Sequence, residues 1–182
     1  MFGLTKKKIR VELDEGVRVI AIGDIHGQLN RLQAVMERVD RYREKHPVEE
    51  EHIVFLGDFA DRGPASAEVI DYLNKRRKEA KNTPHKEIFL KGNHEQLMLN
   101  ALAGEEGKAD LWWRNGGRET VRNYADYCDF TLSGDVISQH LEKLREHFPK
   151  SHRKFYDRLK LLYRVGPLVF VHAGIRMDRS IK

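Results

Sequence analysis

The stretch GDFADRGP, Gly57–Pro64, directly follows the apolar run IVFL, Ile53–Leu56. A short run of aliphatic and aromatic residues of this kind is typical of a buried strand. The two aspartates Asp58 and Asp61 and the arginine Arg62 then lie within five positions of one another. Because charged groups are costly to bury without partners, the stretch predicts a site in which these side chains face ligands or one another.

The same arrangement of an apolar run followed by polar residues occurs elsewhere in the chain. Between the first three runs, the segments 28–46 and 64–81 carry apolar residues at helical spacing. Strands that alternate with helices predict an α/β fold, in which a βαβαβ core forms a parallel sheet, or a sheet pair, flanked by helices. The four predicted strands and their polar ends are VIAIGD (Val19–Asp24), IVFLGD (Ile53–Asp58), IFLKGN (Ile88–Asn93) and LVFVHA (Leu168–Ala173).

After Asn93 the pattern is mostly helical. The stretch HEQLMLNALAG predicts a helix that ends at Gly104, whereas GEEGK and NGG predict loop and turn over residues 105–120. Two further short helices are expected around Leu141–Phe148 and Phe155–Leu162. No repeat or linker divides the chain, so we expect a single domain over residues 1–182.

The composition is that of an ordinary globular protein. Hydrophobic residues make up 40% and charged residues 34% of the 182 residues, which is too apolar for a disordered chain. The net charge of +5 favours an anionic partner only weakly. The single cysteine, Cys128, allows no intramolecular disulfide, which fits a reducing compartment. Since no signal peptide or run of about 18 apolar residues is evident, we expect a cytoplasmic protein without a membrane partner.

The polar ends of the four strands form one candidate site. In open parallel sheets, ligands bind beyond the carboxyl ends of the strands. Carboxylate, amide and imidazole groups together suit Mn, Fe or Zn, and five ligands exceed the needs of one tetrahedral zinc. They suffice for two ions that share a bridging carboxylate. The expected metal ligands are Asp24, His26, Asp58, Asn93 and His172.

Three other polar residues gain roles beside such a metal site. Arg62 offers a planar fork for phosphate oxygens, and His94 is placed to act as a general acid. Asp61 could hold that imidazole in orientation, as carboxylates do for catalytic histidines. Each motif alone could be a simple turn; their joint appearance after successive strands favours a functional site.

These motifs resemble a known family. The series GDIHG, GDFADRG, GNHE and HAG resembles the PPP family of metallophosphatases within the calcineurin-like phosphoesterase superfamily. The stretch GNHEQLMLNALAG followed by LWWRNGGRET is similar to the small bacterial and bacteriophage serine/threonine protein phosphatases. The resemblance runs from about Val17 to Ile175, most of the chain.

The resemblance implies a two-metal site with manganese as the expected metal and iron or zinc as alternatives. Asp24 and His26 would hold the first ion, Asn93 and His172 the second, and Asp58 would bridge both. A hydroxide that bridges the ions would attack phosphorus in line, without a phosphoenzyme intermediate.

The resemblance also assigns the remaining polar residues. Arg62, Asn93 and His94 would contact the substrate phosphate, and Arg62 would clamp it. His94, supported by Asp61, would protonate the departing oxygen.

One departure from the family pattern concerns the second metal. The pattern normally continues with a later arginine and a later histidine, but none of the nine histidines of this sequence lies after His172. Two explanations compete: a shortened chain whose second metal site is incomplete, or a compact variant in which water or a neighbouring chain completes that site. We favour the first, which predicts one tightly bound metal ion, one weakly bound ion and low phosphatase activity. The histidines His140, His147 and His152 are expected to be solvated.

Three functions remain open at this stage. The leading hypothesis is a phosphatase for phosphoserine and phosphothreonine, with phosphotyrosine as a further candidate. The alternatives are hydrolysis of dinucleoside polyphosphates and a catalytically impaired phosphate-binding scaffold. The expected partner is a phosphorylated protein or small phosphoester and not a nucleic acid; the oligomeric state stays open. For Trp112 and Trp113, packing in the core is the favoured interpretation.

Overall fold

A three-stranded parallel sheet forms the centre of the computed structural model, which describes residues 12–175 and residue 178. The strands β1 (Val17–Ile22), β2 (Glu50–Phe55) and β3 (His85–Phe89) lie in the order β1-β2-β3. Ile20 of β1 is opposite Ile53 of β2 in the parallel register. The predicted α/β core is therefore confirmed.

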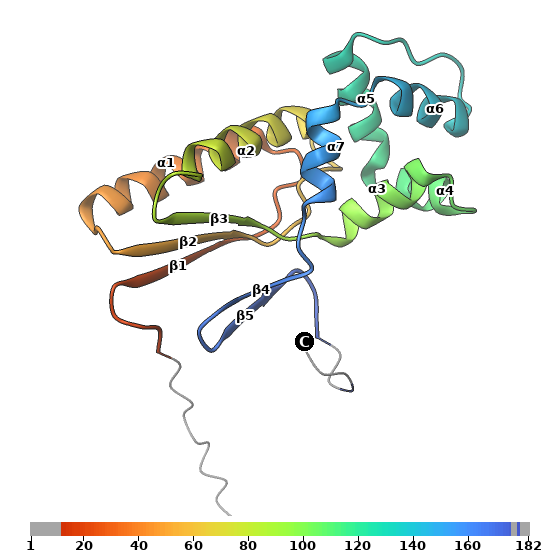
Figure 1. Cartoon of the computed structure of the whole chain (residues 1–182). Helices are drawn as coiled ribbons and strands as arrows, with labels where there is room; N and C mark the ends of the chain where they lie inside the picture. Colours follow the sequence, from red (N-terminus) through yellow and green to blue (C-terminus); the bar gives the residue numbers. More distant parts are fainter. Residues whose placement is uncertain (1–11, 176–177, 179–182) are drawn as a thin grey trace, which may run out of the picture.

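Two helices cover one face of this sheet (Figure 1). Helix α1 (Leu29–Lys45) connects β1 to β2, and helix α2 (Ser66–Ala80) connects β2 to β3. Met36 of α1 and Ile70 of α2 are fully buried and belong to the same core as Phe55 of the central strand. The helical spacing of apolar residues thus turns one face of each helix toward the sheet, as expected.

The opposite face of the sheet is covered by a separate hairpin (Figure 1). Strands β4 (Leu162–Val165) and β5 (Leu168–Val171) pair with each other in antiparallel orientation. Tyr163 and Phe170 pack against a small cluster that includes Val54 and Leu90. The fourth predicted strand therefore belongs to a second sheet, and of the two expected arrangements the structure forms a sheet pair.

Strand β4 differs from the prediction of a helix over Phe155–Leu162. Its first residue, Leu162, continues the helical spacing of Phe155 and Leu159, so the sequence favours a helix there. That helix ends earlier, as α7 (Lys150–Asp157). The residues after it form the hairpin because Tyr163 finds an apolar partner on the sheet, which local periodicity does not reveal.

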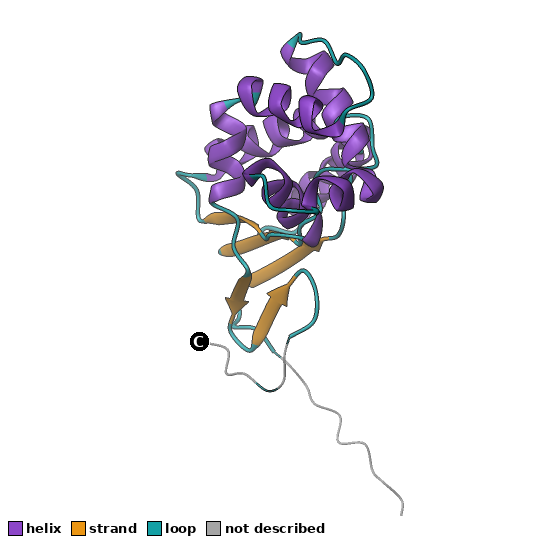
Figure 2. Ribbon diagram, turned by 90° about the vertical axis from the view of Figure 1, so that its right-hand side faces the viewer, coloured by secondary structure: helices purple, strands orange, loops and turns teal. Residues whose placement is uncertain are grey.

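The remaining helices gather beyond one end of the sheet (Figures 1 and 2). As predicted, Gly104 ends α3, in a left-handed conformation that glycine adopts without strain. The prediction of loop and turn over residues 105–120 is wrong, because most of this segment is helical. These helices are α3 (Asn93–Ala103), α4 (Lys108–Trp112), the π-helical turn η1 (Trp113–Gly117), α5 (Arg118–Cys128), α6 (Ile137–His147) and α7.

Two of the three histidines expected to be solvated are buried. His152 is fully buried, with Nδ1 2.8 Å from the hydroxyl of Tyr124 and Nε2 3.1 Å from Oδ1 of Asp71. His140 is also buried and stacks on Trp113, whereas His147 is exposed as expected. The prediction is wrong for His152 and His140 because it is based on the basic composition of α6 and α7, which does not indicate which face of each helix packs inward. Within the described part of the chain, no helix combines the length and the apolar character needed to cross a bilayer.

Candidate active site

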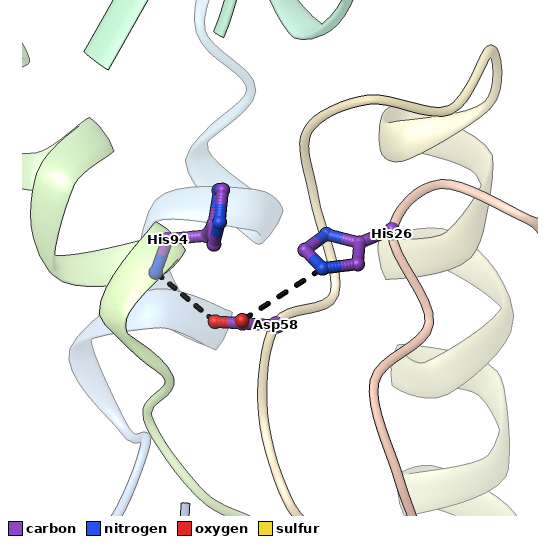
Figure 3. Close-up of side chains that lie close together, drawn as sticks. All are labelled: His26, Asp58 and His94. Atoms are coloured by element: carbon purple, nitrogen blue, oxygen red, sulfur yellow. Dashed lines mark hydrogen bonds and ion pairs between the residues drawn. The ribbon is translucent and has the colours of Figure 1, made fainter. Parts of the chain in front are cut away.

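The ends of the strands bring every predicted site residue into one region around Asp58. The ligand atoms of Asp24, Asp58 and His172 all lie within 4.8 Å of one another. Those of His26, Asp58 and His94 do so as well (Figure 3). Each set joins side chains from separate elements, since Asp24 and His26 follow β1, Asp58 follows β2 and His172 follows β5.

Asp58 lies at the centre of this region and is buried. Its Oδ1 accepts the backbone N–H of His94 at 3.0 Å, at the start of α3 (Figure 3). Its Oδ2 lies 3.8 Å from Nε2 of His26 and 3.3 Å from Nε2 of His172. One carboxylate oxygen therefore faces two imidazoles that come from separate elements.

Backbone carbonyl groups fix the orientation of these two imidazoles. Nδ1 of His26 lies 2.9 Å from the carbonyl oxygen of Ala60, and Nδ1 of His172 lies 2.9 Å from that of Leu56. Because a carbonyl oxygen can only accept, Nδ1 carries a hydrogen in both rings, and Nε2 is the ring atom that faces Asp58 and is left to bind a cation. Histidines that bind metals are commonly held in this way.

Asn93 adds an amide oxygen to the same set. Its Oδ1 lies 2.9 Å from Nε2 of His172, next to Oδ2 of Asp58. Carboxylate oxygens, an amide oxygen and imidazole nitrogens thus converge within a few ångströms. This collection of acceptor atoms fits a divalent cation, and its mixture of oxygen and nitrogen suits Mn, Fe or Zn.

His94 and Asp61 form a buried pair beside the acceptor cluster. Nδ1 of His94 donates to Oδ2 of Asp61 at 2.8 Å, and both side chains are almost completely inaccessible to solvent. The hydrogen bond to Asp61 raises the pKa of His94, although burial opposes this shift. The pairing leaves Nε2 of His94 directed at the site, as a general acid requires.

The guanidinium group of Arg62 lies between two imidazoles. Its Nη1 lies 3.2 Å from Nε2 of His26, and its Nη2 lies 3.0 Å from Nε2 of His94. The guanidinium therefore faces the same space as the acceptor cluster. Arg62 and Asp61 both have positive φ angles, 66° and 70°, which residues other than glycine rarely adopt.

Sequence reasoning missed a carboxylate that ties two of the loops together. Glu95 is buried and accepts the backbone N–H groups of Asp58 and Gly92 at Oε2, at 2.8 and 2.9 Å. Its Oε1 accepts the N–H of Phe59 at 2.8 Å. Burial raises the pKa of Glu95 to about 7. Its place in GNHE was the available signal, but no spacing rule predicts these backbone contacts.

Two further residues that contact the site come from the segment predicted to be loop. Trp112 is buried, as the core interpretation predicted, yet its indole N–H also donates to the carboxylate of Asp61. The hydroxyl of Thr120 donates to the same carboxylate. No feature of the sequence paired either residue with Asp61.

The close packing around Asp58 predicts a strong effect of Gly92→Ala. A Cβ atom at Gly92 would lie 2.0 Å from Oδ1 of Asp58 and 2.5 Å from its backbone N. We expect the variant to lose at least about tenfold in Mn²⁺ affinity and about 1–3 kcal/mol of stability. Isothermal titration calorimetry and thermal unfolding measure the two effects. Gly174→Ala is the matched control, since nothing lies within 4 Å of its Cβ position; equal Mn²⁺ affinity in both variants would contradict the prediction.

Comparison with known proteins supports the same interpretation. Residues 17–178 match the family described as calcineurin-like phosphoesterase. The chain is 31% identical over 137 residues to serine/threonine-protein phosphatase 1 of Salmonella typhimurium. This alignment covers 75% of this chain and 56% of that protein. The chain is 32% identical over 164 residues to bis(5'-nucleosyl)-tetraphosphatase PrpE of Bacillus subtilis, covering 86% and 57%.

A solved structure gives the same fold. The crystal structure of a protein described as a diadenosine tetraphosphatase aligns with a TM-score of 0.50 at 20% identity. The alignment covers 90% of this chain and 53% of the other. The chain thus spans a little over half the length of these relatives.

Proposed function

This chain belongs to the calcineurin-like phosphoesterase family, and on that premise we propose that it is a metal-dependent phosphatase for phosphoserine and phosphothreonine. One observation carries the proposal more than any other. Nε2 of His26 and Nε2 of His172 are directed at the same oxygen of Asp58 by hydrogen bonds on the far sides of their rings. Such preorganisation favours a cation and serves no evident purpose in packing.

The residues that would hold divalent cations are those that converge on Asp58. Cations bound there supply an activated water near neutral pH and neutralise charge on the phosphoryl oxygens. Manganese is the metal that we expect, with iron and zinc as alternatives. The proposed ligands are Asp24, His26, Asp58, Asn93 and His172.

Arg62 would bind the phosphate of the substrate. Its two terminal nitrogens lie next to Nε2 of His26 and Nε2 of His94, and they can donate to two phosphoryl oxygens at once. A guanidinium in this position orients the phosphoryl group and stabilises the negative charge that it carries in the transition state.

His94 would deliver the proton that the leaving group needs. When a hydroxide forms its bond to phosphorus and the bond to the ester oxygen breaks, Nε2 of His94 would give its proton to that ester oxygen, so that inorganic phosphate and the free alcohol leave. Asp61 accepts the Nδ1 hydrogen at 2.8 Å, which keeps the ring oriented and stabilises its charged form. The raised pKa of His94 favours the protonated ring that this step requires.

Hydrolysis of dinucleoside polyphosphates is the second candidate, because PrpE is among the most similar relatives. The two activities can be separated with Mn²⁺ and two substrates, a phosphothreonine peptide and diadenosine tetraphosphate. We expect kcat/KM for the peptide to be higher by at least about tenfold. A higher kcat/KM for diadenosine tetraphosphate would instead identify the chain as a dinucleoside polyphosphate hydrolase.

A third outcome of the same experiment would remove both enzymatic functions. If neither substrate is hydrolysed while the phosphopeptide still binds, the chain is a phosphate-binding scaffold. Arg62→Ala is the control for this outcome, since binding that survives without the guanidinium would not involve the site described above.

A further inference from the structure

The segment Trp112–Thr120, WWRNGGRET, contacts the Asp61–Arg62 pair from the helical side of the molecule. It comprises the end of α4, the turn η1 and the first residues of α5. The site described above needs Asp61 and Arg62, but none of the metal ligands belongs to this segment. Its contacts with the pair therefore call for a separate explanation.

The carboxylate of Asp61 receives most of its hydrogen bonds from this segment. The indole Nε1 of Trp112 lies 3.0 Å from Oδ1 and 2.9 Å from Oδ2, and Oγ1 of Thr120 lies 2.7 Å from Oδ1. With Nδ1 of His94 on Oδ2, both oxygens have two donors. All of these side chains are buried. Such a carboxylate has no freedom to rotate, so its contact with His94 has a single geometry.

Thr120 also holds the backbone of Asp61. Its Oγ1 accepts the Asp61 N–H at 2.9 Å while its hydroxyl hydrogen points to Oδ1 of the same residue. Because that hydrogen is already used, Ser66, whose Oγ lies 3.1 Å away, donates to Thr120. The hydroxyl thus closes a ring that includes both the backbone and the side chain of Asp61.

Gly116 makes the matching contact with Arg62. Its carbonyl accepts the Arg62 N–H at 3.2 Å, and its φ of 106° is in the region that favours glycine. A Cβ atom at Gly116 would lie 2.6 Å from Cγ of Arg62. The next residue, Gly117, allows equally close contact with the indole of Trp112, since a Cβ atom there would lie 2.5 Å from Cδ2 of the ring.

We propose that the segment Trp112–Thr120 positions the Asp61–Arg62 pair, so that His94 and the guanidinium of Arg62 contact the same phosphate group. Trp112 and Thr120 act on His94 through Asp61, and Gly116 acts through Arg62. Since Asp61 and Arg62 both have left-handed backbone conformations, neighbouring contacts must hold them there. The proposal rests on the proposed function, and its three residues are positioning residues.

The first test removes the hydroxyl of Thr120. In Thr120→Val, with Mn²⁺ present, we expect kcat for a phosphothreonine peptide to fall about 10- to 100-fold. For p-nitrophenyl phosphate, whose leaving group needs no proton, kcat should fall less than about threefold. Thr120→Ser retains the hydroxyl and should behave like the unmodified protein. Equal losses on both substrates, or none, would overturn the proposal because a purely structural role does not depend on the leaving group.

A second measurement is independent of turnover. The chain has two tryptophans, Trp112 and Trp113, and Trp113→Phe assigns their indole N–H signals in an NMR spectrum. We expect the Trp112 signal to exchange slowly with water and to move in Thr120→Val and Asp61→Ala, while the Trp113 signal stays in place. If the Trp112 signal has the same chemical shift in Thr120→Val and Asp61→Ala as in the unmodified protein, the proposed contact between Trp112 and Asp61 is overturned.

The contact with Arg62 has its own matched pair of variants. We expect Gly116→Ala to weaken binding of inorganic phosphate, measured with Mn²⁺ present, by about tenfold with unchanged Mn²⁺ affinity. Gly134→Ala is the control, because Gly134 has a φ of 68° but nothing within 4 Å of its Cβ position. Equal phosphate affinity in the two variants would overturn the role of Gly116. If the protein is inactive and yet shows the indole and phosphate effects, the positioning element stands and the proposed phosphatase function fails.

Discussion

We expect Asp58→Asn to abolish measurable Mn²⁺ binding and to lower phosphatase turnover by at least about 10³-fold. The substitution retains the shape of the side chain but removes its charge. With Oδ1 still accepting the His94 N–H, the new amide group would face Nε2 of His26 and Nε2 of His172. The amide of nearly the same shape preserves the packing around residue 58, but it lacks the negative charge that attracts a cation.

Calorimetric titration with Mn²⁺ and release of phosphate from p-nitrophenyl phosphate measure the two effects. Thermal unfolding without added metal should show little change, since the shape of the side chain and its contact with the His94 N–H are retained. Asp126→Asn, on the exposed face of α5, is the control for loss of one negative charge. An Asp58→Asn protein that binds Mn²⁺ as tightly as this control would refute the metal site.

We expect His94→Asn to lower kcat for a phosphothreonine peptide by about 10²- to 10⁴-fold, the usual contribution of a general acid. The loss on p-nitrophenyl phosphate should be much smaller, because its leaving group departs without a proton. Mn²⁺ affinity should change by less than about threefold, since His94 is proposed to act as an acid and not as a ligand. His147→Asn replaces an exposed histidine and serves as the control.

The same experiment tests the alternative role of His94 that the geometry raises. Its ring nitrogen lies within 4.8 Å of the ligand atoms of His26 and Asp58, so it could instead bind a cation. A parallel loss of Mn²⁺ affinity and of turnover on both substrates would identify His94 as a ligand. The hydrogen bond to Asp61 favours the role of general acid over that of metal ligand, because it raises the pKa of His94.

Much of the fold could be predicted because its signals are local. The strand at Ile53–Phe55 and the helix that buries Met36 are each specified by the spacing of apolar residues within a few turns. Strand β4 and the helices within residues 105–128 were not predicted. Leu162 fits a helical period as well as a strand, and the glycines of NGG indicate a turn although they lie within a helical segment.

The sequence by itself determined the βαβαβ core and the polar groups at the ends of its strands, because the carboxyl ends of parallel strands necessarily meet at one edge. Only the tertiary structure decided which groups support them. Trp112 and Thr120 lie 51 and 59 positions from Asp61 in the chain, yet both hydrogen-bond its carboxylate. The burial of His152 against Tyr124 and Asp71 is likewise a tertiary contact. Periodicity shows that a residue faces inward, but which partner it meets depends on how the helices pack on one another, and that is a property of the whole fold.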